Sequence, residues 1–318
     1  MKPARATALF ASLLALGGLA RPVRAQGRPP SDPVAVSSSA SLEYEQQKFG
    51  PGAPKPESYL FFQGKFYGGT TRDPNLEKAQ FGEIVKVLGE SMARQNYFPS
   101  KDPKHADLLV VVHWGVSTIY ENPNKDGELD ELNDATGEYN REVAEYQSGS
   151  PITNDDGTQL PFPDASRLNG DLAQRDADRA LTMRQIALNA QLLGFDGQLL
   201  KDHANGSASS IGVSTEENTL LQSLAEERYF IILMAYDFRT MKKGTAPKLL
   251  WSTRFSIRAP GNFFTAALPV MSKVAADYFG HALDGLRVEV PGVREGHVKL
   301  GAPTVIDSPS EGTGTKKK

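Results

Sequence analysis

Two unbroken apolar runs, far apart in the chain, most strongly constrain what this 318-residue sequence can fold into. The first is Leu108–Val112, inside the longer segment Asp107–Ile119, and the second lies within Arg228–Phe238. Short continuous runs of Val, Ile, Leu and Phe are typical of strands that are covered on both faces. The sequence therefore predicts a sheet with two buried central strands.

Two further segments have the composition of strands. Ser58–Tyr67 is rich in aromatic residues, and Lys248–Arg258 alternates apolar with polar side chains. Alternation with a period of two indicates a strand with one buried face and one wetter face. We expect Lys248–Arg258 to pair antiparallel with Arg228–Phe238.

Two helices are predicted to cover this sheet. Asp73 and Pro74 form an N-cap and first-turn signal for an amphipathic helix over Asn75–Gln95. A second helix is expected from Gly261-Asn262 to about Phe279, with a start or a kink at Pro269. The order β-α-β, an insertion, then β-β-α predicts an α/β (α+β) fold, a two-layer sandwich of a mixed sheet with helices packed on it.

The N-terminus resembles an export signal. Residues 1–25 combine Lys2 and Arg5, an apolar run over 6–20, and small residues before a cleavage point after Ala25 or Ala20. An uncleaved membrane anchor is the alternative, but the run is shorter than the ~20 residues that a spanning helix needs. We therefore expect an exported protein in the periplasm or on the cell surface.

The rest of the chain divides by composition. Residues 26–57 are rich in Pro, Ser and Gly, and 307–318 form a polar tail, so both are expected to be disordered. A single α/β domain is expected over 58–306, with a long, partly disordered insertion at about 121–227. Within that insertion, Asp176–Leu193 and Thr215–Glu227 have helical patterns.

Composition excludes several classes of function. The chain has no cysteine, which excludes disulfides, thiolate catalysis and thiolate metal sites. Its net charge is -3, and removal of residues 1–25 makes it more acidic, so nucleic acid is a disfavoured partner. No phosphate-binding motif occurs, and no cofactor is expected.

Three short stretches resemble a bacterial exported family of unknown function that is common among periplasmic lipoproteins. They are Tyr97–His113, Leu233–Asp237 with the following Leu249-Leu250-Trp251, and Asp277-Tyr278-Phe279. The resemblance covers about 58–119 and 228–280. This chain departs from the family in lacking the lipid-bearing cysteine and in carrying the long insertion. The resemblance implies an envelope location and a related fold, and it implies no catalytic activity.

An acidic cluster in the insertion is one candidate metal site. Asp126, Glu128 and Asp130 imitate part of a calcium loop, although Asn133 stands where such a loop requires a bidentate Glu. A weak calcium site is therefore one hypothesis, and a solvated acidic loop is the more favoured one.

Three residues are candidate ligand contacts at the sheet. His113 and Trp114 close the first central strand, where ligand sites of α/β sheets tend to open. Asp237 ends the second central strand and either binds a ligand or caps the following turn. We favour the structural alternatives for all three residues. In these, His113 is a hydrogen-bonded sheet-edge residue, Trp114 belongs to the core and Asp237 caps the turn.

The pattern supports two functional hypotheses. The first is a non-enzymatic binding or assembly module whose partner is an envelope protein or glycan, with no membrane span once the signal is removed. The second is a secreted hydrolase of unrecognised type, with His113, Asp237 and Ser117 converging at one sheet edge. The second requires these side chains to lie within hydrogen-bond reach of one another.

Overall fold

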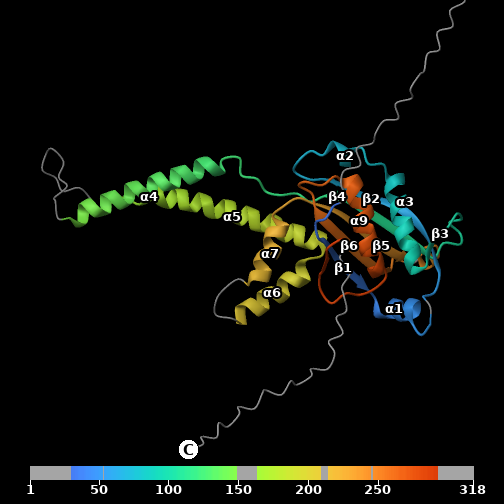
Figure 1. Cartoon of the computed structure of the whole chain (residues 1–318). Coiled ribbons are helices and arrows are strands. Elements are labelled where there is room, and N and C mark those ends of the chain that lie inside the picture. The colour runs from blue at the N-terminus through green and yellow to red at the C-terminus, as the bar shows by residue number, and fades with distance from the viewer. Residues whose placement is uncertain (1–29, 53, 149–162, 209–213, 245, 293–318) are drawn as a thin grey trace, which may run out of the picture.

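The computed structural model describes residues 30–52, 54–148, 163–208, 214–244 and 246–292. Within these ranges a seven-stranded mixed sheet has the order β3-β2-β4-β5-β6-β1-β7 (Figure 1). The strands are β1 (Val34–Ala40), β2 (Glu57–Gly68), β3 (Tyr97–Pro99), β4 (Leu108–Val116), β5 (Arg228–Asp237), β6 (Leu249–Arg258) and β7 (Arg287–Glu289). Helices pack on this sheet, which confirms the predicted α/β class.

The two apolar runs form the centre of the sheet, as predicted. β4 pairs antiparallel with β5, and β5 pairs antiparallel with β6. β2 runs parallel to both β4 and β3. The expected pairing of the second apolar run with the alternating strand is therefore confirmed.

The prediction of a disordered tether over residues 26–57 is wrong for the described part. Val34–Ala40 forms β1, which pairs with β6, and Val34 and Val36 are fully buried. The serines that made this segment look like a linker also stabilise the sheet. The Oγ atom of Ser38 lies 2.7 Å from Thr253 Oγ1, and the two hydroxyls share a hydrogen bond. Ser41 then caps α1 (Leu42–Phe49).

The helices outside the insertion differ in detail from the prediction. Asp73 caps a short helix, α2 (Pro74–Glu77), with Pro74 at its first position, and α3 (Phe81–Met92) follows separately. α9 (Phe264–Ala275) begins well before Pro269 and contains it, so the predicted start at that proline is wrong. α8 (Phe238–Met241) joins β5 to the loop before β6.

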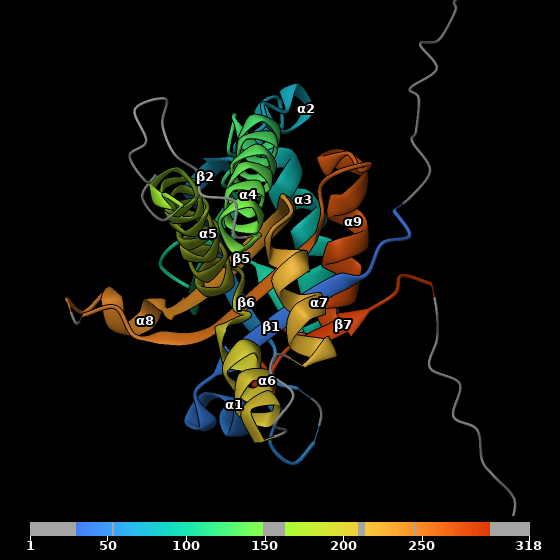
Figure 2. The same ribbon diagram turned by 90° about the vertical axis from the view of Figure 1, so that its left-hand side faces the viewer.

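The insertion is largely helical where it is described. Its helices are α4 (Lys125–Gln147), α5 (Ser166–Leu193), α6 (Asp196–Ala208) and α7 (Thr215–Leu224). α4 and α5 contact each other and form a hairpin that extends away from the sheet (Figures 1 and 2). The loop predicted for the acidic part of the insertion is therefore replaced by a helix.

Helices cover both faces of the sheet. The larger core lies between the sheet and α3 and α9, which lie side by side (Figure 2). A smaller core on the opposite face joins Phe230 and Ile232 of β5 to Leu193 of α5 and Leu224 of α7. The predicted two-layer arrangement thus gains a second, smaller helical layer.

Two predicted features lie outside the described residues. They are the export signal at 1–25 and the tail at 307–318.

Candidate functional site

His113 lies on β4 and is half buried beside a register shift in the β2–β4 pairing. The backbone N–H of Lys65 donates a hydrogen bond of 2.9 Å to its Nδ1. Burial, followed by the nearby Lys65 ammonium, lowers the pKa of His113 below its usual value. Its ring is therefore kept neutral and held against the backbone of β2. This is the role of a hydrogen-bonded sheet histidine that the sequence analysis favoured.

Trp114 belongs to the core. Its side chain is buried, and its ring contacts those of Phe66 and Phe81 on β2 and α3. His113 and Trp114 also point to opposite faces of the sheet, because successive residues of a strand alternate. The two residues do not share one pocket.

Asp237 caps a helix. Its Oδ1 accepts a hydrogen bond from the backbone N–H of Thr240 at 3.1 Å, which starts α8. Asp237 pairs with Leu108 at one end of β4, whereas His113 pairs with Ile232. Asp237 is therefore five residue steps along β5 from the partner of His113, a distance of about 17 Å along the strand.

This geometry contradicts the hydrolase hypothesis. His113 and Asp237 are too far apart for a hydrogen bond, and an odd separation along a strand places them on opposite faces. The hydroxyl of Ser117 is committed elsewhere, since its Oγ accepts a hydrogen bond from the backbone N–H of Arg228. The three residues do not form a catalytic site.

The acidic residues proposed for calcium lie on a helix. Asp126, Glu128 and Asp130 fall in the first two turns of α4, so the predicted calcium loop is wrong. No group of three or more His, Asp or Glu side chains in the described ranges is arranged to hold a metal ion. The acidic cluster is part of the surface of a helix.

Glu128 has a role at the base of the hairpin. Asn122 Nδ2 donates hydrogen bonds to Glu128 and to Asp178 of α5, and Tyr120 donates to the same aspartate. Loss of surrounding water, and then the contact with Asp178, raise the pKa of Glu128 above its usual value. This carboxyl pair joins α4 to α5 where the hairpin leaves the sheet.

The base of the hairpin is also fixed to the sheet. Asn189, buried near the end of α5, donates hydrogen bonds from Nδ2 to the carbonyls of Thr118 and Leu224. Ile186 and Leu193 of α5 enter the smaller core beside it. Within the described residues, these contacts anchor the hairpin at its base.

Beyond this base the hairpin is open to solvent. The buried residues of α4 are Leu132 and Ala135, and those of α5 all lie at or after Ile186. Several large apolar side chains on the two helices are exposed by a third or more. They are Leu129, Tyr146, Leu172, Leu181, Met183 and Leu188.

The two helices of the hairpin differ in charge. α4 carries eight acidic and two basic residues, while α5 carries four arginines and three aspartates. An ion pair of 2.7 Å between Arg167 and Glu138 crosses the hairpin. Most of the acidic charge of α4 is left without a counter-charge from α5, so α4 presents a strongly acidic surface.

The sequence did not predict the hairpin. The buried residues of α4 are Leu132 and Ala135, which are too few to form an apolar stripe along a helix of this length. Such a stripe is the main sequence signal for an amphipathic helix. The run of like charges was a usable signal, because charge runs mark exposed helices and interaction segments.

Within the described residues, no helix is both long and apolar enough to cross a membrane.

Comparisons with known proteins give no family. No family model matches the chain, and no curated protein matches it. Among solved structures, it is similar to a PDZ domain protein from Parabacteroides distasonis ATCC 8503, at 9% sequence identity and a TM-score of 0.31. That alignment covers 81% of this chain, and this chain spans 39% of the length of the other.

Proposed function

We propose that this protein is a non-enzymatic binding or assembly module of the bacterial cell envelope. We further propose that the α4–α5 hairpin is the element that contacts its partner. The observation that carries this proposal is the hairpin itself, which extends from the body and is anchored at one end (Figure 1). A two-helix hairpin that buries so little is poorly stabilised alone, so its exposed apolar side chains favour a bound partner.

The charge of α4 narrows the chemistry of the partner. Asp130, Glu131 and Asp134 are all exposed on this helix. A protein surface that combines basic and apolar groups would complement the acidic helix and the apolar side chains beside it. We therefore favour a protein partner over a glycan.

The proposed location rests on the N-terminal pattern of residues 1–25. Cell fractionation with mass spectrometry of the N-terminus tests it. We expect a mature chain that begins after Ala20 or Ala25 in the envelope fraction. An intact Met1 on protein recovered from the cytosol would contradict the export.

The proposed role of the hairpin is tested by pull-down from envelope extracts. The wild-type chain is compared with the double variant Asp130→Asn/Glu131→Gln, and Glu83→Gln/Glu90→Gln on α3 serves as the matched control. We expect the α4 variant to lose a partner that the wild type and the control retain. Recovery of no partner above background, or equal recovery by all three, would contradict the proposal.

A further inference from the structure

Arg228 is a buried cation on the face of the sheet that α5, α6 and α7 cover. It is the first residue of β5, and its side chain is 7% exposed. Its Nε donates to Ser256 Oγ at 3.1 Å, and its two Nη atoms donate to Ser223 Oγ and to the Ser256 carbonyl. All three acceptors are neutral oxygens, and a guanidinium has five N–H donors.

No carboxylate in the described ranges pairs with Arg228. Glu227, the acid next to it in sequence, accepts hydrogen bonds from the backbone N–H groups of Thr70 and Thr71. Glu226 is bound to Arg258 with an N–O distance of 2.5 Å. Asp32 accepts a hydrogen bond of 2.6 Å from Asn262. Burial lowers the pKa of Arg228 to about 10, although Glu226 and Asp32 act in the opposite direction. A buried charge without a counter-ion is costly, so an anion at this position would stabilise the site.

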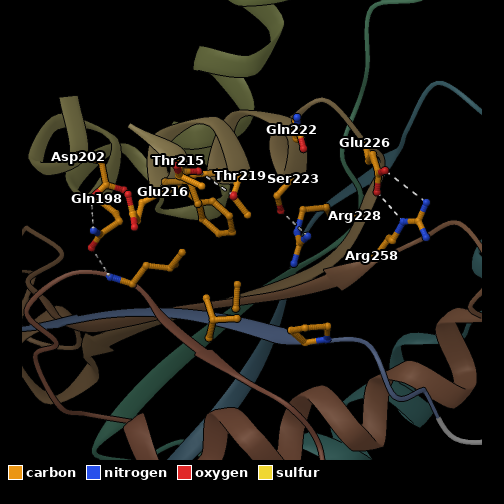
Figure 3. Close-up of a pocket in the computed structure, with 16 residues that line it drawn as sticks. Gln198, Asp202, Thr215, Glu216, Thr219, Gln222, Ser223, Glu226, Arg228 and Arg258 are labelled. Atoms are coloured by element: carbon orange, nitrogen blue, oxygen red, sulfur yellow. Dashed lines mark hydrogen bonds and ion pairs between the residues drawn. The ribbon is translucent and has the colours of Figure 1, made fainter. Parts of the chain in front are cut away.

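A cavity of about 680 Å³ lies beside this guanidinium. It opens between α6 and α7 on one side and β1 and β7 on the other (Figure 3). Ala35, Phe195, Leu220 and Val288 give it apolar walls. The volume is within the range of small-molecule sites, which are mostly apolar with a few placed polar groups.

The two ends of the cavity differ in charge. Arg228 and Ser223 lie at one end, and Asp202 and Glu216 lie at the other (Figure 3). Asp202 accepts a hydrogen bond of 2.8 Å from Gln198 through one oxygen. The acidic end would repel a second negative charge, so the cavity suits a ligand with one anionic group and an apolar body.

We propose that this cavity binds a small organic carboxylate, with its anionic group on Arg228 and its apolar chain against Phe195 and Leu220. The guanidinium is suited to this role, because its planar donors match a carboxylate in two parallel hydrogen bonds. The proposal goes beyond the role of the hairpin. It is also independent of it, since none of the lining residues belongs to α4 or α5.

Isothermal titration calorimetry of the full chain tests the proposal, with octanoate as the probe and octanamide as its neutral isostere. We expect octanoate to bind and octanamide to bind about ten- to a hundredfold more weakly, as the loss of charged hydrogen bonds implies. Equal binding of the two probes, tighter binding of octylammonium than of octanoate, or no binding of octanoate would each overturn the proposal.

Variants assign the binding to this cavity. Arg228→Gln should weaken octanoate binding about ten- to a hundredfold. Arg239→Gln, which removes the same charge from an exposed position on α8, should leave the affinity unchanged. If Arg228→Gln fails to fold, Leu220→Trp provides the test, because it fills the cavity and leaves Arg228 in place. Retention of wild-type affinity by either cavity variant in a folded state would overturn the proposal.

Discussion

The two faces of the sheet are built from different residues although they share the same strands. On the face under α3 and α9, β6 contributes Trp251, Phe255 and Ile257 to a continuous apolar core. On the face under α5, α6 and α7, the same strand contributes Ser252, Ser256 and Arg258. One face is packed for stability, and the other combines polar groups with a cavity.

The two faces therefore differ in what they contribute to stability and to binding. A filled apolar core resists change in any side chain, because interiors are packed as densely as organic crystals. A face with a cavity is less stabilising, because the side chains that line the cavity lack van der Waals contacts on one side. A buried cation without a counter-ion adds a further cost. We infer that the first face holds the fold together, while the second face and the hairpin attached to it carry the binding functions.

The largest expected effect separates the two faces with the same substitution. Leu88 of α3 is fully buried in the larger core, whereas Leu220 of α7 is half buried and lines the cavity. Leu88→Ala should lower the free energy of unfolding by about 2–5 kcal/mol, because it leaves a void in a filled core. Leu220→Ala should cost about 1 kcal/mol or less, because less buried area is lost. Urea denaturation measures both, and equal costs would contradict the comparison.

A smaller effect is expected where the hairpin joins the sheet. Asn189→Ala removes both hydrogen bonds from the buried side chain to Thr118 and Leu224. The change should cost about 1–3 kcal/mol, since the carbonyl of the buried Leu224 and the carbonyl of Thr118 both lose this partner. Thermal unfolding checks the size of the loss. Hydrogen exchange should show increased opening in α5 and α7 with α3 unchanged, and equal loosening on both faces would argue against a separate second layer.

The smallest effect is a pH dependence at the base of the hairpin. The pKa of Glu128 is raised in the folded state, so the folded state binds the proton more tightly than the unfolded state does. The resulting stability is present below the usual pKa of a glutamate and is lost as the pH rises through the raised value. Glu128→Gln keeps a neutral group here and should flatten this dependence. Hydrogen exchange of α4, measured between about pH 4 and pH 7, compares the variant with the wild type.

The sequence predicted the elements whose signal is local and apolar. β4 and β5 were evident from unbroken runs, β6 from its alternation and α3 from its spacing. β1 was missed because Ser and Pro dominate its surroundings, and only its contact with β6 shows that Val34 and Val36 face the core.

The candidate site was less predictable than the fold. The roles of His113 and Asp237 as sheet and capping residues agree with the favoured structural interpretations. The position of Arg228 beside a cavity depends on α6, α7 and β7, which come from separate parts of the chain. Such a meeting of distant segments leaves no pattern in any short stretch, so spacing and composition gave no signal for it.

Native-state hydrogen exchange tests the central claim most directly, namely that stability belongs to one face and binding to the other. We predict that amides of α3, β4 and β5 exchange only through global unfolding, while those of α6 and α7 exchange through local openings of lower free energy. Protection of α6 and α7 equal to that of β4 and β5 would contradict the account, because the two faces would then form one cooperative core.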